Sequence, residues 1–316
     1  MNTIGDLGAT RGCYRKGEIY EKRQLYTFDQ QLTNLMIFFS IVMPAYNAEN
    51  EITETIQSIL CQTYPHFELI VVNDGSTDNT KAIVEKFAES DTRIKLIDKI
   101  NGRQAAARNA GIKAALHEWI AFVDSDDPWV NIKLERQVTD IKDRGNEIGL
   151  FFSNCYKKRD NQIFESDLDK SGKVLVGAPL VGLLADYNFI VPSTVVAKKN
   201  IIESVGAFDE NPGFHNVEDF HLWMKLAIAG CKFWGSADFL CIRTIRNNSS
   251  SGRDRGQFFG VVLCLQTLKK KADAKTGFLI TQQLKKKIRE KSAIRNGYSL
   301  NGKLRIFWLK LKSIAL

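Results

Sequence analysis

The stretch from Trp119 to Asp127 reads WIAFVDSDD, an apolar run followed at once by a cluster of acids. The run WIAFV has the continuous apolar character of a buried strand. Three carboxylates in the next four residues repel one another, and a divalent cation would relieve that repulsion; hard oxygen ligands suit Mg²⁺ or Mn²⁺. The alternative is a capped helix start before Pro128-Trp129. We expect a metal-binding loop at the end of this strand.

Upstream of this stretch, short apolar runs alternate with segments of helical periodicity. Apolar runs separated by helices indicate a parallel sheet that is covered on both faces. We therefore predict an α/β fold with an open, mostly parallel sheet up to about Phe152. The expected strands are Phe38–Met43, Phe67–Val72 and Arg93–Ile97, and the expected helices are Glu51–Cys61, Asp78–Ala88 and Arg103–Leu116.

Downstream of Phe152 the alternation weakens, and the elements are assigned one by one. We predict a loop or hairpin at Asn154–Lys173, a strand at Ile190–Ala197, a helix at Val217–Ala229, one or two strands within Lys232–Ile242, and helices near Gln257–Lys271 and Phe278–Ile294.

Composition limits the class of protein. The 316 residues are 44% hydrophobic, enough for a sizeable core. No apolar run approaches the roughly 18 residues of a membrane-spanning helix, so we expect none. None of the six cysteines belongs to a CxxC pair, which favours free thiols in a reducing compartment.

The net charge of +8 is concentrated at the C-terminal end of the chain. Residues 269–316 hold 14 Lys and Arg and two acids, which leaves the rest of the chain mildly acidic. Such a tail suits an anionic partner, either nucleic acid or an anionic membrane surface. The alternative is an ordinary solvated helix face.

Two further loops with polar residues follow expected strands. The first is Pro44–Glu49 (PAYNAE), and the second is Asn73–Asp78 (NDGSTD). Ligands of open α/β sheets bind at the carboxyl ends of the strands, where these loops and the acidic loop should meet. The second loop is also what a turn followed by a helix cap would require. The chain has neither GxxxxGK[ST] nor GxGxxG after its first strand, which disfavours a P-loop ATPase and an ordinary dinucleotide-binding domain.

The order of five sequence blocks resembles the family 2 glycosyltransferases of the GT-A fold. The blocks are SIVMPAYNAE, ELIVVNDGSTDNT, NGRQAAARNAGIKAA, WIAFVDSDDPW and VEDFHLWMKLA, and the match covers roughly Phe38 to Asn248. The resemblance implies an inverting enzyme that uses a nucleotide-sugar donor, usually a UDP-sugar. This places the catalytic domain at 37–250. Residues 1–36 lack clear periodicity and are predicted to be an N-terminal extension, either a flexible arm or an extended start, and charge and periodicity predict a C-terminal helical basic region at 251–316. Within the catalytic domain, 37–152 is the nucleotide-binding half and 153–250 the acceptor-binding half.

The resemblance also assigns roles to single residues. Asp124 and Asp126 match the DxD motif, with Asp126 the better metal ligand and Asp124 facing the ribose or donor sugar. Glu218 and Asp219 resemble the ED motif, with Asp219 as general base. The nucleotide- and donor-binding residues implied are Pro44, Tyr46, Glu49, Asp74, Arg103, Arg108, Asp124, Ser125, Arg243 and Arg246. Asp74 would accept a hydrogen bond from the uracil NH, and Arg108 would lie near the nucleotide, with Arg103 the weaker candidate.

These roles agree with the chemistry of glycosyl transfer. A nucleoside diphosphate leaves readily only when its developing charge is neutralised, which Mn²⁺ or Mg²⁺ can do. A sugar hydroxyl is a weak nucleophile, so a carboxylate must take its proton. One departure concerns the segment CIRTIRNNS at residues 241–249. It lacks the histidine that many family members carry there, and Arg243 and Arg246 are its candidates to meet the diphosphate.

Alternatives to a glycosyltransferase are a nucleotidyltransferase, which would release pyrophosphate, and a non-enzymatic protein that binds nucleic acid or an anionic surface through its tail. The resemblance favours synthesis of a surface polysaccharide or lipopolysaccharide, with a glycan or lipid-linked glycan as acceptor and no nucleic-acid partner. We further predict a cytoplasmic protein held at the membrane by interfacial helices. Their apolar faces would be Phe278, Ile280, Leu284 and Ile288, followed by Leu304, Phe307, Trp308 and Leu311. The alternative is that these faces pack on the catalytic domain or on a second subunit.

Overall fold

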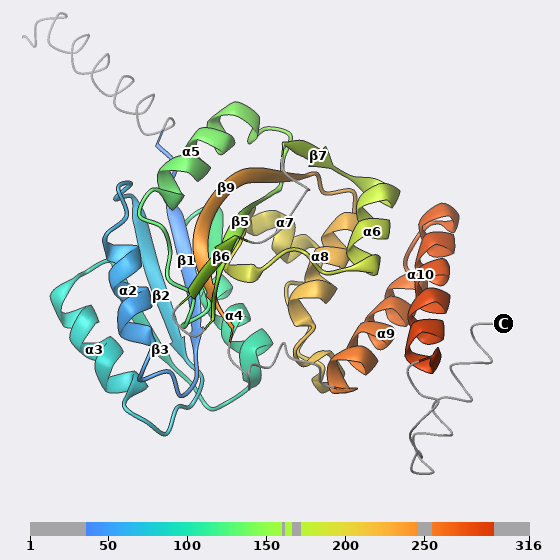
Figure 1. The fold of residues 1–316 in the computed structure, drawn as a ribbon. Helices are drawn as coiled ribbons and strands as arrows, with labels where there is room; N and C mark the ends of the chain where they lie inside the picture. Colours follow the sequence, from blue (N-terminus) through green and yellow to red (C-terminus); the bar gives the residue numbers. More distant parts are fainter. Residues whose placement is uncertain (1–35, 160–161, 166–171, 246–254, 294–316) are drawn as a thin grey trace, which may run out of the picture. The chain divides into compact units, whose positions relative to one another are not determined.

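A mixed sheet organises the chain in the computed structural model, which describes residues 36–159, 162–165, 172–245 and 255–293. Within these ranges the strands run in the order β3-β2-β1-β4-β8-β5-β9-β7, with β6 paired to β5 (Figure 1). The first four strands of this order are parallel: β3 (Ile94–Asp98), β2 (Phe67–Asn73), β1 (Phe39–Ala45) and β4 (Trp119–Phe122). All residues of β1, β2 and β4 are buried, as continuous apolar runs require.

The register of the parallel strands brings the loops that follow them together. Ala45, the last residue of β1, pairs with Asn73, the last residue of β2, and Asn73 pairs with Asp98, the last residue of β3. The three strands therefore end at one level, and Asp74 and the 46–49 loop start side by side. This part of the fold confirms the predicted open parallel sheet.

The other half of the sheet is mixed. β8 (Val196–Lys198) is antiparallel to both β4 and β5 (Leu150–Arg159), whereas β9 (Phe233–Thr244) is parallel to β5. The edge strand β7 (Lys173–Leu175) is antiparallel to β9. β6 (Gln162–Glu165) forms an antiparallel pair with β5, which is the hairpin predicted as one of two alternatives for residues 154–173.

One predicted strand is largely wrong. Instead of a single strand at Ile190–Ala197, a 3₁₀ turn, η1 (Pro192–Thr194), occupies the middle of this segment and only the three-residue β8 follows. Pro192 cannot donate a backbone hydrogen bond to a sheet, and it stands at the start of the turn, where none is required.

Helices cover the sheet and complete the fold. In chain order they are α2 (Ile52–Leu60), α3 (Thr80–Ser90), α4 (Arg103–Ala114), α5 (Lys133–Arg144), α6 (Gly177–Asp186), α7 (Lys199–Ser204), α8 (Glu218–Ile228), α9 (Arg255–Lys269) and α10 (Ala274–Ala293), with a second 3₁₀ turn, η2 (Pro212–Phe214), before α8. None of the described helices is long and apolar enough to span a bilayer.

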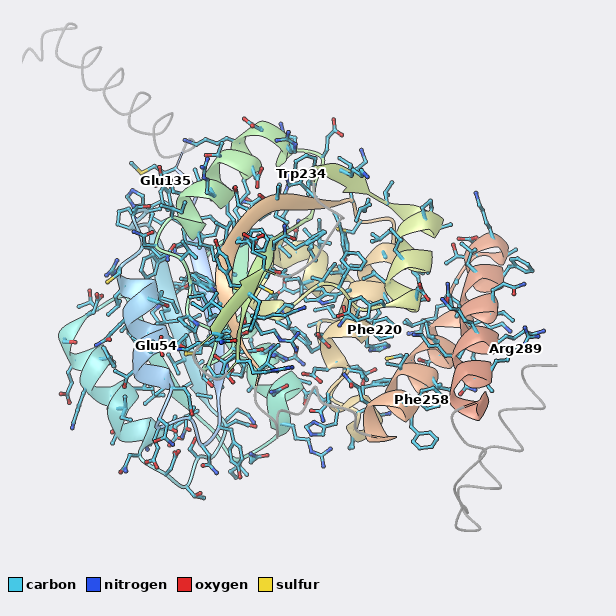
Figure 2. All side chains as sticks on the ribbon, in the orientation of Figure 1. Glu54, Glu135, Phe220, Trp234, Phe258 and Arg289 are labelled. Carbon is cyan, nitrogen blue, oxygen red and sulfur yellow. The ribbon has the colours of Figure 1, made fainter. Side chains whose placement is uncertain are left out.

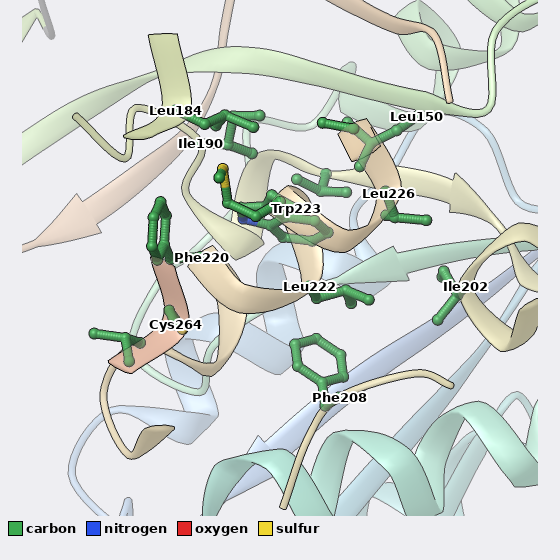
Figure 3. Close-up of a cluster of buried hydrophobic side chains, with 14 of the residues drawn as sticks. Leu150, Leu184, Ile190, Ile202, Phe208, Phe220, Leu222, Trp223, Leu226 and Cys264 are labelled. Carbon is green, nitrogen blue, oxygen red and sulfur yellow. The ribbon is translucent and has the colours of Figure 1, made fainter. Parts of the chain in front are cut away.

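The main core lies between the sheet and α8. Trp223 of α8 is fully buried, and its ring lies near Phe122 of β4 and Phe208. Figure 3 shows Leu222, Trp223 and Leu226 of α8 surrounded by apolar side chains from several elements. This packing fixes the start of α8, and with it Glu218 and Asp219.

The apolar face of α10 is part of the same core. Ile280, Leu284 and Ile288 are buried, and α10 packs against α6 and α9. The prediction that this face meets lipid is therefore wrong for these three residues, because the protein itself covers them. Phe278 alone of the four remains 62% exposed. The second predicted apolar face, at residues 304–311, lies outside the described residues.

Candidate active site

A pocket of about 980 Å³ lies where β1, β2 and β4 end, and it extends toward α8 and α10. It brings together residues that are far apart in the sequence. Of the predicted site residues, Pro44, Tyr46, Asp74, Arg103, Arg108, Asp124, Ser125, Asp126, Glu218, Asp219 and Arg243 line it. Glu49 is not among its lining residues, and Arg246 lies outside the described residues.

Asp74 is held rigidly at the end of β2. Its Oδ1 accepts hydrogen bonds from the backbone N–H of Gly102 (2.9 Å) and from Nζ of Lys99 (2.7 Å). Its own N–H donates to the carbonyl oxygen of Ala45 (2.8 Å), at the end of the neighbouring strand. Because both donors use Oδ1, Asp74 can present Oδ2 to a ligand.

The loop after β1 is braced against the loop after β2. The N–H of Asn47 donates to Oγ of Ser76 (3.0 Å), and Oδ1 of Asn47 accepts from the N–H of Thr77 (2.9 Å). Oε2 of Glu49 accepts from the backbone and side-chain nitrogens of Asn79, just before α3 begins. Glu49 therefore binds the start of α3, whereas Tyr46 lines the pocket.

The acidic loop is anchored through its last carboxylate. Asp127 is buried, and its Oδ2 accepts a hydrogen bond from Oγ of Ser193 (2.6 Å) while its Oδ1 accepts from the N–H of Thr244 (3.2 Å). Oγ of Ser193 also accepts from the N–H of Asp124 (3.0 Å), and Oγ1 of Thr244 donates to the carbonyl oxygen of Asp126 (2.9 Å). Burial, together with the charges of Asp124 and Asp126, raises the pKa of Asp127 well above its ordinary value. The loop is therefore fixed by η1 on one side and by the end of β9 on the other.

Arg108 joins the acidic loop to the start of α8. Its side chain is 2% exposed, and it donates from Nη2 to Oδ1 of Asp124 (2.7 Å) and from Nη1 to Oε1 of Glu218 (2.8 Å). Burial opposes the charged form, but the carboxylates of Asp124 and Glu218 outweigh it and raise the pKa of Arg108. The position that the resemblance placed near the nucleotide is thus also a bridge between the two sides of the pocket.

Asp219 combines a fixed position with an altered acidity. Its Oδ1 accepts from the N–H of Phe220 (2.7 Å), and its Oδ2 accepts from Nδ2 of Asn188 (3.1 Å). Burial, and next the charge of Glu218, raise the pKa of Asp219 to about 6. A carboxylate of this kind is ionised at neutral pH and is a stronger base than an ordinary aspartate, which suits general-base catalysis. Phe220, which follows it on α8, is labelled in Figure 2.

Backbone strain is concentrated at this pocket. Asn47, Arg103 and Asn216 have positive φ angles of 48°, 69° and 64°, and all three line the pocket. Only one other non-glycine residue of the described chain, Ala207, has a positive φ. Strained backbone of this kind is common at ligand-binding sites, because the surrounding structure must impose it.

Asp124 and Asp126 are the residues of the acidic loop that could hold a divalent cation. Among the described residues, no three His, Cys, Asp or Glu side chains are grouped closely enough to hold a metal ion by themselves. Asp124 and Asp126 both line the pocket, and Mg²⁺ sites that act on phosphates commonly use one or two carboxylates and take further ligands from the phosphates and water.

Three side chains that organise the site were not predicted: Asn188, Ser193 and Thr244. They bond Asp219, Asp127 and Asp126, which lie 31, 66 and 118 residues away in the sequence, so no local pattern could reveal them.

A mixed sheet whose parallel strands β1, β2 and β4 end at a pocket with an acidic loop and a buried carboxylate defines the chain as an enzyme of the GT-A class. The model of glycosyl transferase family 2 matches residues 40–175. TuaG of Bacillus subtilis, a glycosyltransferase assigned to teichuronic acid biosynthesis, is 30% identical over 224 residues, which cover 70% of this chain and 84% of TuaG. The chain belongs to glycosyl transferase family 2 and is a glycosyltransferase.

One further relative supports the family, and two solved structures show the same fold. WfgD of Escherichia coli, a UDP-Glc:α-D-GlcNAc-diphosphoundecaprenol β-1,3-glucosyltransferase, is 35% identical over 194 residues, 59% of this chain and 68% of WfgD. The structure of Staphylococcus aureus TarS 1–349 with UDP-GlcNAc superposes with a TM-score of 0.67 at 22% identity, over 87% of this chain and 79% of the 1–349 chain. The mannosyltransferase PcManGT of Pyrobaculum calidifontis, with GDP-Man and Mn²⁺, gives 0.60 at 18% identity, over 87% and 84%. The shared fold confirms the predicted GT-A architecture.

Proposed function

We propose that this enzyme transfers a sugar from a UDP-sugar to an acceptor hydroxyl during synthesis of a surface polysaccharide or lipopolysaccharide, with inversion at the anomeric carbon. The observation that carries the proposal is that one pocket holds Asp74, Asp126 and Asp219. WfgD is named for a UDP-sugar donor and TuaG for a surface glycan, which supports both parts. Membership of family 2 favours this reading over a nucleotidyltransferase.

The donor would bind across the ends of the parallel strands. Asp74 offers Oδ2 to the uracil NH, and Tyr46 packs on the base from the neighbouring loop. Arg103 and Arg243 both line the pocket and supply positive charge for the diphosphate. Pro44 and Ser125 complete the donor side, and Arg246 remains a candidate from sequence alone.

Asp126, with Asp124 beside it, would hold the Mn²⁺ or Mg²⁺. When bound, such a cation neutralises charge on the diphosphate of the leaving nucleotide. The known Mn²⁺ complex of PcManGT supports this choice of metal. The contribution of the chain is to hold the two carboxylates in place through Ser193, Thr244 and Arg108.

Asp219 would then act on the acceptor. Its carboxylate takes the proton of the acceptor hydroxyl while the oxygen forms a bond to the anomeric carbon of the donor. The bond between that carbon and the diphosphate oxygen breaks, and the nucleoside diphosphate leaves with the electron pair. One base and no covalent intermediate give inversion. Glu218 stays paired with Arg108 and fixes the start of α8.

A panel of nucleotide sugars tests this proposal. With Mn²⁺ present, the true donor should raise the melting temperature, because a ligand that binds only the folded state stabilises it by mass action. At a ligand concentration of a hundred times its Kd, the free energy of unfolding should rise by about 2.7 kcal/mol. Turnover with an acceptor should then release nucleoside diphosphate. Release of pyrophosphate would instead identify a nucleotidyltransferase, and the absence of stabilisation by any UDP-sugar would contradict the donor assignment.

We also propose that the enzyme works on the cytoplasmic face of the membrane, as a peripheral protein. The support is the density of cations near its C-terminal end, because each Lys or Arg near an anionic bilayer contributes about 1 kcal/mol of attraction.

A further inference from the structure

The pocket continues past Asp219 and reaches the C-terminal helix α10. Asn188, whose amide donates to Asp219, lies two residues after Asp186, the last residue of α6. The backbone oxygen of Asp186 accepts a hydrogen bond from Nζ of Lys287 on α10 (2.7 Å). Asp186, Asn188 and Lys287 all line the pocket. A continuous wall therefore leads from the catalytic carboxylate to a lysine of α10.

Lys287 is held in place by its own helix and by the end of α6. The buried Leu284 and Ile288, which precede and follow Lys287 in the sequence, fasten that turn of α10 to the protein. The neighbouring Lys286 donates to the carboxylate Oδ1 of Asp186 (2.6 Å), whereas Lys287 donates to the uncharged carbonyl oxygen of the same residue. The two lysines thus use different groups of Asp186, and the ammonium group of Lys287 is fixed at the pocket wall.

Charged side chains of both signs line the pocket. Its acids include Asp124, Asp126 and Asp219, its cations include Arg103, Arg108 and Arg243, and Asp186 and Lys287 line it where α6 meets α10. The diphosphate of the proposed donor accounts for Arg103 and Arg243. A lysine on the acceptor side is suited to a second anionic group, because an ammonium is a compact donor for phosphate oxygens.

We propose that Lys287 binds a phosphate group of the acceptor, so that the acceptor is a glycosyl phosphate or diphosphate rather than a neutral glycan. This inference rests on the proposed function, in which the acceptor hydroxyl reaches Asp219. An acceptor sugar in that position extends along the 186–188 wall, and the substituent at its other end meets α10. The acceptor named for WfgD, a sugar on diphosphoundecaprenol, has this chemistry. Lys287 lies well beyond residues 40–175, the part that the family model matches.

A binding experiment on the full chain tests the proposal. The donor site is first saturated with UDP and Mn²⁺, and then N-acetylglucosamine 1-phosphate, its neutral methyl glycoside and inorganic phosphate are titrated separately by calorimetry. The sugar phosphate should bind more tightly than either of the other two. Lys287→Ala should weaken its binding about tenfold, the loss expected for a charge-assisted hydrogen bond, and Lys287→Arg should restore most of it.

Arg289→Ala is the matched control, because it removes a cation from the same helix. Arg289 is exposed and, in Figure 2, points away from the body of the protein. The Arg289→Ala variant should bind the sugar phosphate as tightly as the wild type does. Inorganic phosphate binding as tightly as the sugar phosphate would reveal a general anion site and overturn the proposal. The proposal would also be overturned if the sugar phosphate and the neutral methyl glycoside bound equally or not at all. An equal loss of affinity for the sugar phosphate in Lys287→Ala and Arg289→Ala would overturn it as well. Saturation by UDP and Mn²⁺ is measured first, so a failure of the proposed donor site is recognised separately.

Discussion

At the scale of single residues, Asp219 shows how burial prepares a carboxylate for proton transfer. It sits at the start of a helix, where the dipole favours its ionised form, yet burial dominates and raises its pKa to about 6. Above that pH the carboxylate is ionised and able to accept a proton. The same burial makes the ionised form costly to the folded state.

Asp219→Asn should therefore separate activity from stability. Transfer should fall by about 10²-fold or more while donor binding persists, because only the proton acceptor is removed. In the wild type, activity should fall as the pH drops through about 6. Because the pKa of Asp219 is raised in the folded state, ionisation of this carboxylate lowers the free energy of unfolding. The loss is absent below the unfolded-state pKa of about 4 and is complete above about 6. The variant should melt higher than the wild type at pH 7.5 and show no such gain near pH 4. An unchanged rate, or a loss of donor affinity with intact turnover, would show that Asp219 is not the base.

Asp126 is the second residue whose role can be tested singly, and its proposed role is to hold a cation rather than to transfer a proton. Asp126→Ala should reduce transfer by about 10²-fold or more and abolish the Mn²⁺-dependent part of UDP binding, since a ligand of the cation is lost. Uridine binding, which depends on Asp74, should be unaffected. Isothermal titration of UDP with and without Mn²⁺ gives the comparison. Asp143→Ala removes an exposed acid of α5 and serves as control. Near wild-type turnover in Asp126→Ala would rule out the metal assignment.

At the scale of elements, the turn η1 acts as a support for the acidic loop. Ser193 is fully buried and bonds both Asp124 and Asp127. Ser193→Ala should lower stability by about 1–3 kcal/mol, because it leaves buried polar groups without a partner. It should also weaken Mn²⁺-dependent UDP binding about tenfold, as a loosened loop would hold the cation less well.

A neighbouring hydroxyl provides the control for this variant. Thr194 is equally buried, but its Oγ1 donates to the carbonyl oxygen of Val191 and not to the acidic loop. Thr194→Val should cost similar stability and leave Mn²⁺-dependent UDP binding intact. Thermal unfolding and calorimetry on the two variants decide the matter: equal effects on UDP binding would reduce Ser193 to a purely structural role.

The elements that could be predicted from sequence are those whose pattern is local. β1, β2 and β4 are apolar throughout because both of their faces are buried, and each is followed by a polar loop. The helix α5 is not among the predicted elements, although its buried Leu134, Val138 and Ile141 recur at helical spacing. The burial of its first residue, Lys133, whose pKa is lowered to about 7, could not be read from the sequence. The hydroxyl of Ser193 and the amide of Asn188 acquire their roles only when distant segments meet, so neither could be found in the sequence.

At the scale of the whole molecule, the C-terminal helices belong to the folded enzyme. α10 buries Ile280, Leu284 and Ile288 against the core and contributes Lys287 to the pocket. Its apolar face is therefore not available for lipid. Any membrane attachment through this end must use exposed cations, together with the sequence that follows Ala293.

Residues 294–316 carry the sequence features that this attachment requires. They include five Lys and Arg, no acids, and the apolar set Leu304, Phe307, Trp308 and Leu311. The full chain should sediment with anionic vesicles at low salt and be released as salt rises, because screening weakens the attraction. A chain ending at Ala293 keeps α10 and its packing and should sediment at least about tenfold less, given about 1 kcal/mol for each lost cation. The double variant Phe307→Ser and Trp308→Ser keeps every charge and should fall between the two, since it loses only apolar insertion. Neutral vesicles provide the background. If the full and shortened chains sediment equally, or neither does, residues 294–316 are not the attachment.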